Sequence, residues 1–250
     1  MRPLSISLAA QLHVERQLDS TDYRFVIGVD EVGRGSWAGP LGVGAVVYDL
    51  KLLLKLMPRI DGTVEDEDGK GSERLDYLRV DDSKRLSAKL RASLDGPIKK
   101  LAEGYGVGMV EPSEIDEMGM TSALALGLER ALMPVRRFLD RSLLLLDGSV
   151  NFSRYSNSMT LVKGDSKSFA IASASIIAKV ARDSLMEDES LNFPWYAFER
   201  NKGYPSLAHV SALHAVGPSL IHRKSWSYMA GLPWQTSNPN PVSQQLSLWG

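Results

Sequence analysis

The sequence predicts an α/β fold in which helices pack on a mixed β-sheet. Short, β-branched runs bounded by glycine at 25–29 and 42–47 are typical of strands. Further strands are expected at 105–110, 143–146 and 159–162. Helical patterns lie between and after these runs, and chains that interleave strands with helices build layered sheets.

Apolar spacing predicts two long helices. The first spans 121–139 and should break near Met133-Pro134, because proline cannot continue a helix. The second spans 168–186, and its apolar residues recur at helical spacing on one face. These residues are Ile171, Ala174, Ala178, Ala181 and Leu185. The stretch 33–40 is rich in Gly and Pro and predicts a turn or short loop.

Composition bounds the class of protein. The 250 residues are 44% apolar and 24% charged, which suits one large soluble domain and excludes collagen-like, coiled-coil or wholly disordered chains. No apolar run approaches the roughly 20 residues of a membrane span, so no membrane association is expected. Cysteine is absent, which fits a reducing cytoplasm. Residues 1–10 make a poor signal peptide and a fair first turn of a helix.

Four acids follow predicted strands. Asp30 and Glu31 follow one apolar strand, Asp147 follows four consecutive leucines, and Asp165 precedes the second long helix. Acids at strand ends point out at the edge of a sheet, where open α/β sheets hold their sites. Converging carboxylates repel one another, and two divalent cations would cancel their charge. Oxygen ligands suit Mg²⁺ or Mn²⁺, whereas the lack of Cys and the presence of only four His, none in a paired spacing, disfavour zinc.

Simpler roles for these acids stay open. Asp165 could cap the helix that follows it, and Asp147-Gly148 could be only a turn. Successive residues on a strand also face opposite ways. Asp30 and Glu31 therefore share a site only if the strand bends or ends there, which the following glycines favour.

The glycine-rich loop does not match a nucleotide fingerprint. Gly33, Gly35 and Gly39 miss the dinucleotide spacing, and no Walker lysine is present. The loop offers close backbone approach to a ligand, and Arg34 between two glycines can reach a phosphate.

Six motifs resemble those of type 2 ribonuclease H, the ribonuclease HII family. They occur in the family's order and span about residues 23–228: 30–35 with 38–40, 81–87, 146–148, 163–165 with 171–183, 201–204 and 217–226. Ser149 and Pro205 depart from the family's pattern.

The resemblance implies a role for each matching residue. The metal-binding, catalytic acids would be Asp30, Glu31, Asp147 and Asp165. The Gly33-Arg34-Gly35 turn would contact the ribose 2′-hydroxyl and its phosphate. Lys84 would contact a phosphate, and Tyr204 would stack on the next deoxyribose and sense the RNA–DNA junction. Asp183, five turns beyond Asp165, is expected to be structural and paired with a base.

The resemblance also implies a domain organisation. A ribonuclease H-like catalytic domain would span 23–190, with an acidic insertion at about 50–80. A helical segment, 1–22, would precede it, and a helical C-terminal extension, 191–231, would follow it. Residues 232–250 would form a flexible tail.

The implied activity is two-metal hydrolysis on the 5′ side of ribonucleotides. Substrates would be RNA–DNA hybrids and duplex DNA that carries single ribonucleotides, so the enzyme would remove misincorporated ribonucleotides and RNA primers. Two alternatives belong to other classes: a non-catalytic hybrid-binding protein recruited to the replication clamp, and another metal-dependent nuclease or transposase on the same fold.

The last residues resemble a bacterial sliding-clamp-binding peptide, with Trp249 in place of the usual Phe. The matching residues are Gln245, Leu246, Leu248 and Trp249. An extended tether followed by apolar anchors suits docking into a groove. An ordinary apolar C-terminus that folds back on the domain is the alternative.

A net charge of −1 seems at odds with a nucleic-acid partner. Setting aside the four site acids and the acidic run Glu65–Asp68 leaves 22 of the 30 acids against 29 basic residues. Basic residues cluster at Lys84, Arg85, Lys89 and Arg91, at Lys163, Lys167, Lys179 and Arg182, and at Arg200, Lys202, Arg223 and Lys224. These clusters would contact phosphates or simply form a solvated surface.

Overall fold

A computed structural model describes residues 13–19, 21–56, 80 and 86–232. The N-terminal ten residues, Lys84, the acidic run Glu65–Asp68 and the predicted clamp-binding peptide lie outside the described residues. Among the described helices, none combines the length and apolarity needed to cross a bilayer.

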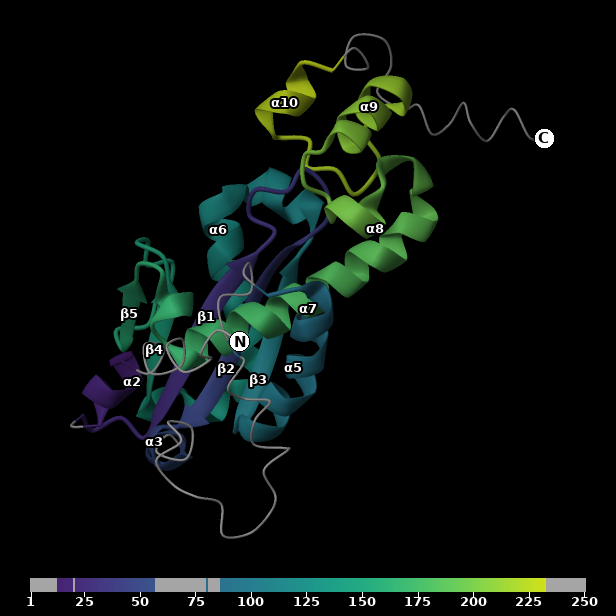
Figure 1. The fold of residues 1–250 in the computed structure, drawn as a ribbon. Helices are drawn as coiled ribbons and strands as arrows, with labels where there is room; N and C mark the ends of the chain where they lie inside the picture. Colours follow the sequence, from purple (N-terminus) through teal and green to yellow (C-terminus); the bar gives the residue numbers. More distant parts are fainter. Residues whose placement is uncertain (1–12, 20, 57–79, 81–85, 233–250) are drawn as a thin grey trace.

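A five-stranded mixed sheet forms the centre of the molecule (Figure 1). Its order is β3-β2-β1-β4-β5. β1 and β2 pair antiparallel, as do β2 and β3, whereas β4 runs parallel to β1 and to β5. The strands are β1 (Phe25–Val32), β2 (Leu41–Asp49), β3 (Gly104–Val110), β4 (Ser142–Asp147) and β5 (Ser158–Leu161). All five predicted strands are therefore confirmed, although β1 runs three residues further than expected.

Helices cover both faces of the sheet. Alternate residues of β1 enter two separate cores: Val26 packs with α7 (Phe169–Asn192), and Ile27 and Val29 pack with α6 (Pro112–Leu132). The consecutive leucines of β4 divide in the same way, so a strand buried on both faces explains its unbroken apolar run. The remaining helices on this body are α2 (His13–Leu18), α3 (Leu50–Leu56), α5 (Ala88–Leu101) and the 3₁₀ segment η2 (Met133–Arg141).

Both long helices differ from their predicted bounds. α6 ends at Leu132, where 3₁₀ geometry takes over, so the predicted break near Met133-Pro134 is confirmed. Its backbone is kinked at Gly119 (φ +76°), so the part after the kink starts close to the predicted residue 121, and a further helical stretch precedes it. It begins with Pro112 in its first turn, a position that tolerates proline. α7 continues six residues beyond the predicted Met186, because no helix breaker occurs before Pro194.

Glycine lets α7 cross the sheet at close range. A Cβ on Gly28 would lie 2.0 Å from the carbonyl carbon of Ala170, and one on Gly44 would lie 2.4 Å from the carbonyl oxygen of Ala174. Any larger residue would push the helix away. This contact brings α7 against the strand that carries Asp30.

The chain beyond α7 folds into a small helical lobe. Its elements are η4 (Pro194–Tyr196), α8 (Phe198–Asn201), α9 (Leu207–Val216) and α10 (Ser227–Ala230). They lie past the C-terminal end of α7 (Figure 1). The lobe has its own core, in which Met186 of α7 packs with Phe198, Leu213 and Met229.

Candidate active site

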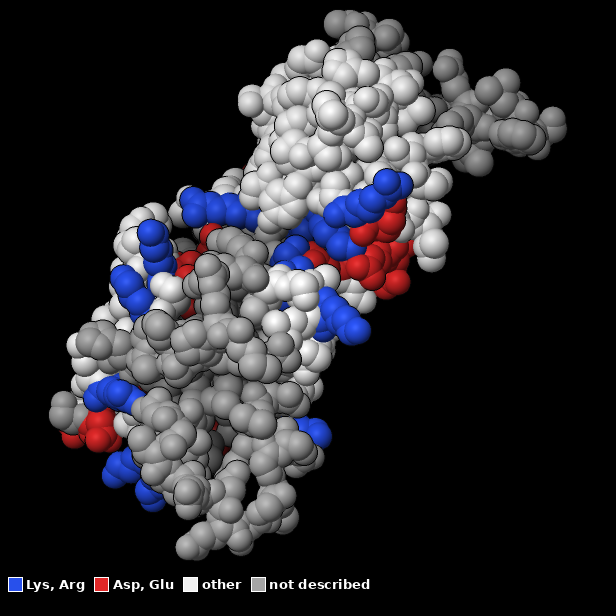
Figure 2. All heavy atoms as spheres, viewed as in Figure 1, with Lys and Arg blue, Asp and Glu red and all other residues white. Residues whose placement is uncertain are grey.

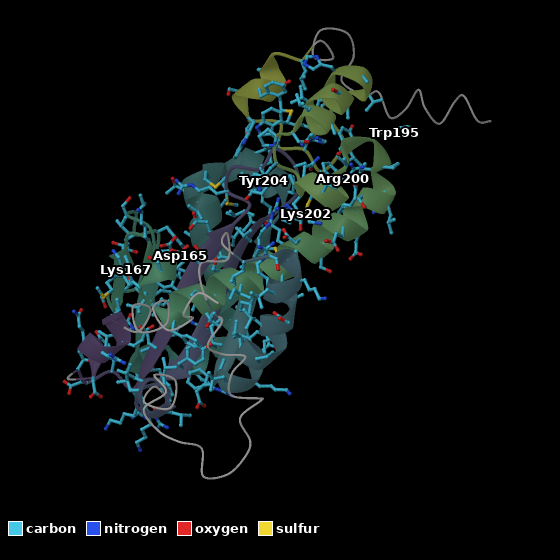
Figure 3. The ribbon with its side chains drawn as sticks, viewed as in Figure 1. Asp165, Lys167, Trp195, Arg200, Lys202 and Tyr204 are labelled. Atoms are coloured by element: carbon cyan, nitrogen blue, oxygen red, sulfur yellow. The ribbon has the colours of Figure 1, made fainter. Side chains whose placement is uncertain are left out.

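The four predicted acids lie where the ends of β1 and β4 meet the start of α7. Asp30 and Glu31 lie in β1, and Asp147 is the last residue of β4. Val29 of β1 and Leu146 of β4 are partners in the parallel ladder. Asp30 directly follows Val29 and Asp147 directly follows Leu146, so the two acids occupy corresponding positions on neighbouring strands. Asp165 lies in η3 (Gly164–Ser166), between β5 and α7. Figure 3 shows Asp165 below the C-terminal lobe.

The charges of the other three acids act on Asp30. Its side chain is buried, and burial raises its pKa well above the usual value. A hydrogen bond with Ser175 of α7 lowers this pKa, while the charges of Asp147, Glu31 and Asp165 raise it further. The Glu31 N–H donates to Asp30 Oδ1 at 2.8 Å. The four carboxylates therefore share one electrostatic environment.

Asp147 holds the turn that carries Asp165. Its Oδ1 accepts a hydrogen bond from the Gly164 N–H at 2.6 Å. Asp165 itself is buried. It does not cap α7: the Ser168 side chain accepts from the Ile171 N–H, so Ser168 is the N-cap and the capping alternative for Asp165 is wrong.

β1 does not end at Asp30 and Glu31, contrary to the expectation from the following glycines. It continues to Val32, so the two side chains point to opposite faces of the strand. Asp30 faces α7, and the half-buried Glu31 lies 3.7 Å from an Nη atom of Arg34. Within the described part of the chain, no three His, Cys, Asp or Glu side chains are close enough to hold one ion together. The metal-binding assignment therefore stays a prediction.

The donor chemistry of the site suits a hard divalent cation. All four side chains offer carboxylate oxygens, which Mg²⁺ and Mn²⁺ prefer. Their mutual repulsion disfavours four simultaneous negative charges around the buried Asp30. Added positive charge would relieve that repulsion.

The glycine loop lies directly against Tyr204. The Gly33 N–H donates to Tyr204 Oη at 3.1 Å, and the Trp37 N–H donates to the Gly203 carbonyl at 2.8 Å. Gly33 has φ +81°, and a Cβ there would lie 2.2 Å from Arg182 Nε. A Cβ on Gly35 would meet no described atom within 4 Å. Thus one glycine is required by internal packing, and the other faces open space.

Two fully buried arginines hold this loop, and the sequence interpretation missed their role. Arg182 of α7 donates to the carbonyls of Pro40, Ala38 and Lys202 and to Ser36 Oγ, at 2.8–3.1 Å. Arg223 donates to the carbonyls of Gly39 and Arg34. Burial lowers the pKa of both, that of Arg223 to about 9.

These arginines correct the sequence interpretation of the basic clusters. Arg182 and Arg223 were grouped with residues that would contact phosphates or form a solvated surface, and they do neither, because both are 0% exposed. An arginine whose acceptors lie far away in the sequence cannot be recognised from its sequence neighbours. Asp183 forms ion pairs with Lys179 and Arg91, which confirms the expected structural pairing.

Other basic side chains lie on the surface. Figure 2 shows Lys and Arg across the middle of one face, between the sheet and the C-terminal lobe, with acidic side chains among them. Lys202 Nζ lies 2.6 Å from Glu187 Oε1, and Lys167 Nζ donates to the Val162 carbonyl at 2.7 Å. In Figure 3 Lys167 lies near Asp165, whereas Lys202 and Arg200 lie near Tyr204.

Comparisons with known proteins agree on one family. A family model described as Ribonuclease HII matches residues 65–229. A Ribonuclease HII of Streptomyces coelicolor is 37% identical over 224 residues, which cover 88% of this chain and 84% of the relative.

Two solved structures have similar folds. Ribonuclease H2 from Pyrococcus horikoshii matches with a TM-score of 0.60 and 25% identity, over 82% of this chain and 95% of that one. The chain matched in the PCNA:RNase HII complex from Archaeoglobus fulgidus also has a TM-score of 0.60, with 26% identity over 81% and 95%.

Proposed function

Because the chain belongs to the ribonuclease HII family, and is therefore a ribonuclease H that acts on RNA–DNA hybrids, we propose that it incises on the 5′ side of ribonucleotides. Its substrates are RNA–DNA hybrids and single ribonucleotides embedded in duplex DNA. The products carry 3′-hydroxyl and 5′-phosphate ends. This activity removes misincorporated ribonucleotides and RNA primers, and the cysteine-free composition suits a cytoplasmic setting.

One observation carries this proposal: a cluster of mutually repelling acids lies beside a backbone loop hydrogen-bonded to a tyrosine. The acids supply a setting for phosphodiester hydrolysis. The loop and Tyr204 supply groups that can read a sugar. A nuclease that cuts plain DNA needs only the first of these, because the 2′-hydroxyl alone distinguishes RNA at such a site.

Asp30, Glu31, Asp147 and Asp165 would hold two Mg²⁺ or Mn²⁺ ions, consistent with their all-oxygen donor set. Such ions supply a lowered pKa for the attacking water and charge stabilisation for the leaving 3′ oxygen. The protein's own contribution is to hold the carboxylates in place. The Gly164 N–H holds the Asp147 carboxylate, and a hydrogen bond with Ser175 holds Asp30.

The sugar would be read by the glycine loop and Tyr204. The open space at Gly35 lets a nucleotide approach the backbone, whose N–H groups can bind the 2′-hydroxyl and phosphate. Arg34 has a half-exposed side chain that can turn toward a phosphate. Tyr204 would stack on the sugar of the next deoxynucleotide, with its ring direction set by the bond to Gly33.

A sliding clamp is the proposed protein partner, bound through Gln245, Leu246, Leu248 and Trp249. The complex of PCNA with RNase HII in the Archaeoglobus structure supports a clamp partner for this family. Deleting residues 244–250 should abolish clamp binding and leave incision unchanged. Unchanged clamp affinity in the truncated protein would exclude this role for the tail.

The proposed activity can be tested with two duplexes of identical sequence, one all-DNA and one with a single ribonucleotide. With Mg²⁺, the protein should cut only the second, on the 5′ side of the ribonucleotide. Cleavage of both duplexes would indicate a general nuclease. Binding of an RNA–DNA hybrid without any cleavage would favour the non-catalytic alternative.

A further inference from the structure

Two buried histidines lie behind Tyr204 in the C-terminal lobe. His209 is on α9, and His222 is on the segment between α9 and α10. Both are 1% exposed or less, and their Nε2 atoms lie 2.9 Å apart. Two ring nitrogens at that distance form a hydrogen bond only if one carries a proton and the other does not.

The backbone at each end of the pair determines where the protons are. The Ser219 N–H can only donate, and it points at His222 Nδ1 at 2.9 Å, so this nitrogen is bare. Neutral His222 therefore carries its proton on Nε2 and donates to His209 Nε2. His209 then carries its proton on Nδ1 and donates to the Tyr204 carbonyl at 3.0 Å. One arrangement of neutral tautomers therefore satisfies every hydrogen bond from Ser219 through the two histidines to Tyr204.

The surroundings keep both rings neutral. Burial lowers the pKa of His209, and burial together with the neighbouring His209 lowers the pKa of His222 to about 3. The rings pack among Tyr196, Phe198 and Trp37. The Tyr196 hydroxyl donates to the Gly217 carbonyl and has a pKa raised to about 12 by burial, so it also stays neutral.

The chain of hydrogen bonds ends on the residue that would read the sugar. Tyr204 is bound at three points: its N–H donates to the Asn201 carbonyl at 2.9 Å, its carbonyl accepts from His209, and its hydroxyl accepts from Gly33. The first two bonds orient the backbone from which the ring projects. Figure 3 shows Tyr204 at the base of the lobe, on the side facing the sheet.

At its other end, the chain of hydrogen bonds reaches the glycine loop through His222. His222 forms a β-bridge with Ala38, and the Arg223 N–H donates to the Trp37 carbonyl at 2.8 Å. The loop and Tyr204 are thus joined twice. The histidine pair links the loop to the Tyr204 carbonyl, and the Gly33 N–H bonds to the Tyr204 hydroxyl.

We infer that His209 and His222 form a neutral relay, in which His222 fixes the His209 tautomer that donates to the Tyr204 carbonyl, and that this bond positions Tyr204 relative to the glycine loop and so sets the selectivity for single embedded ribonucleotides. The inference rests on the proposed function, in which Tyr204 senses the RNA–DNA junction. A single ribonucleotide depends on that junction at every cut, whereas a long hybrid offers many sites without one. Displacing Tyr204 therefore affects the first substrate more.

Two matched variants separate positioning from simple packing. In H209N the amide nitrogen lies near the position of Nδ1 and keeps a donor for the Tyr204 carbonyl, but it loses His222. In H209Q the longer side chain keeps contact with His222 and loses the donor to Tyr204. Each variant leaves one buried partner unsatisfied, so their stabilities should fall by similar amounts.

The measurement is kcat/KM on a single-ribonucleotide duplex divided by kcat/KM on an RNA–DNA hybrid. In H209Q this ratio should fall about three- to tenfold, the effect of one net hydrogen bond, and in H209N it should stay within about twofold of wild type. A ratio unchanged in H209Q, or lowered equally in both, would overturn the inference. Wild-type protein that cuts neither duplex would instead refute the proposed function.

A second measurement needs no variant. Nitrogen-15 NMR of the wild-type histidine rings should show a proton on His209 Nδ1 and on His222 Nε2, with the other two ring nitrogens bare. The opposite tautomers, or a doubly protonated ring at neutral pH, would contradict the relay even if both variants failed to fold.

Discussion

The two halves of the site treat buried charge in opposite ways. At the sheet edge, acids crowd together, and the charges around Asp30 raise the free energy of its ionised form. In the loop and lobe, the buried cations Arg182 and Arg223 donate to backbone carbonyls, and the two histidines stay neutral. An added cation would stabilise the ionised acids of the first region, whereas the buried cations of the second already have acceptors within the protein.

This difference indicates how the work is divided. In the proposed function, a preorganised loop and Tyr204 would select the sugar without rearrangement, because their positions are set by many internal hydrogen bonds. The acidic edge gains its favourable electrostatics only when positive charge arrives. Selection would then belong to the rigid half and hydrolysis to the half that depends on a cation.

The largest effect is expected from D165N, which disables the acidic half alone. Cleavage of the single-ribonucleotide duplex should fall by about three orders of magnitude or more, since a proposed catalytic acid is removed. Affinity for the duplex should persist, because the loop and Tyr204 are untouched. Single-turnover rates and a binding titration measure the two quantities. Wild-type cleavage in D165N would refute the assignment of this acid.

R182M disrupts the loop and lobe, the half of the site whose buried cations have acceptors within the protein. It removes the guanidinium that holds four acceptors of the loop and lobe, and the free energy of unfolding should fall by roughly 3–5 kcal/mol. R154M is the control, because Arg154 is 73% exposed and its described ion pair is with the partly exposed Glu129. Its cost should stay below about 1 kcal/mol in urea unfolding. Equal costs would mean that the loop is not held by Arg182.

A smaller, pH-dependent effect is expected at Glu15, a buried acid with no ion pair among the described residues. Its Oε1 accepts from Ser168 Oγ and the Ala170 N–H, and its Oε2 has no hydrogen-bond partner. Burial raises its pKa from 4.5 to about 7. Because the folded pKa lies above the unfolded one, this acid's stability contribution is complete below about pH 4.5 and is lost as pH rises through 7.

E15Q mimics the neutral acid and should escape that loss. The difference in unfolding free energy between E15Q and wild type should shift in favour of E15Q by about 2–3 kcal/mol between pH 5 and pH 8. Urea unfolding at both pH values measures it. A difference that is independent of pH would mean that Glu15 ionises normally in the folded protein.

What the sequence could predict depended on local signals. The strands followed from β-branched runs, and Asp147 and Asp165 were noticed because each lies beside an apolar element. The continuation of β1 through Glu31 was not foreseen, because its pairing with β2 outweighs the turn tendency of the glycines. The helical stretch before the Gly119 kink of α6 was not predicted, because Pro112 suggests a break but fits a first turn.

The rest depended on contacts between distant residues. Arg182 and Pro40 are 142 positions apart, and His209 meets His222 only because α9 and the following segment fold together. In the sequence these residues are ordinary basic or polar positions. Only their burial and their partners reveal that they orient the loop and Tyr204.

Calorimetric titration of Mn²⁺ tests the central contrast most directly. Wild type and Y204F, which changes only the loop and lobe, should bind Mn²⁺ with equal affinity. In the D30N/D165N double variant, binding should weaken by more than about 100-fold, because two of the four proposed ligands are lost. Equal Mn²⁺ affinity in the double variant and wild type would contradict the account.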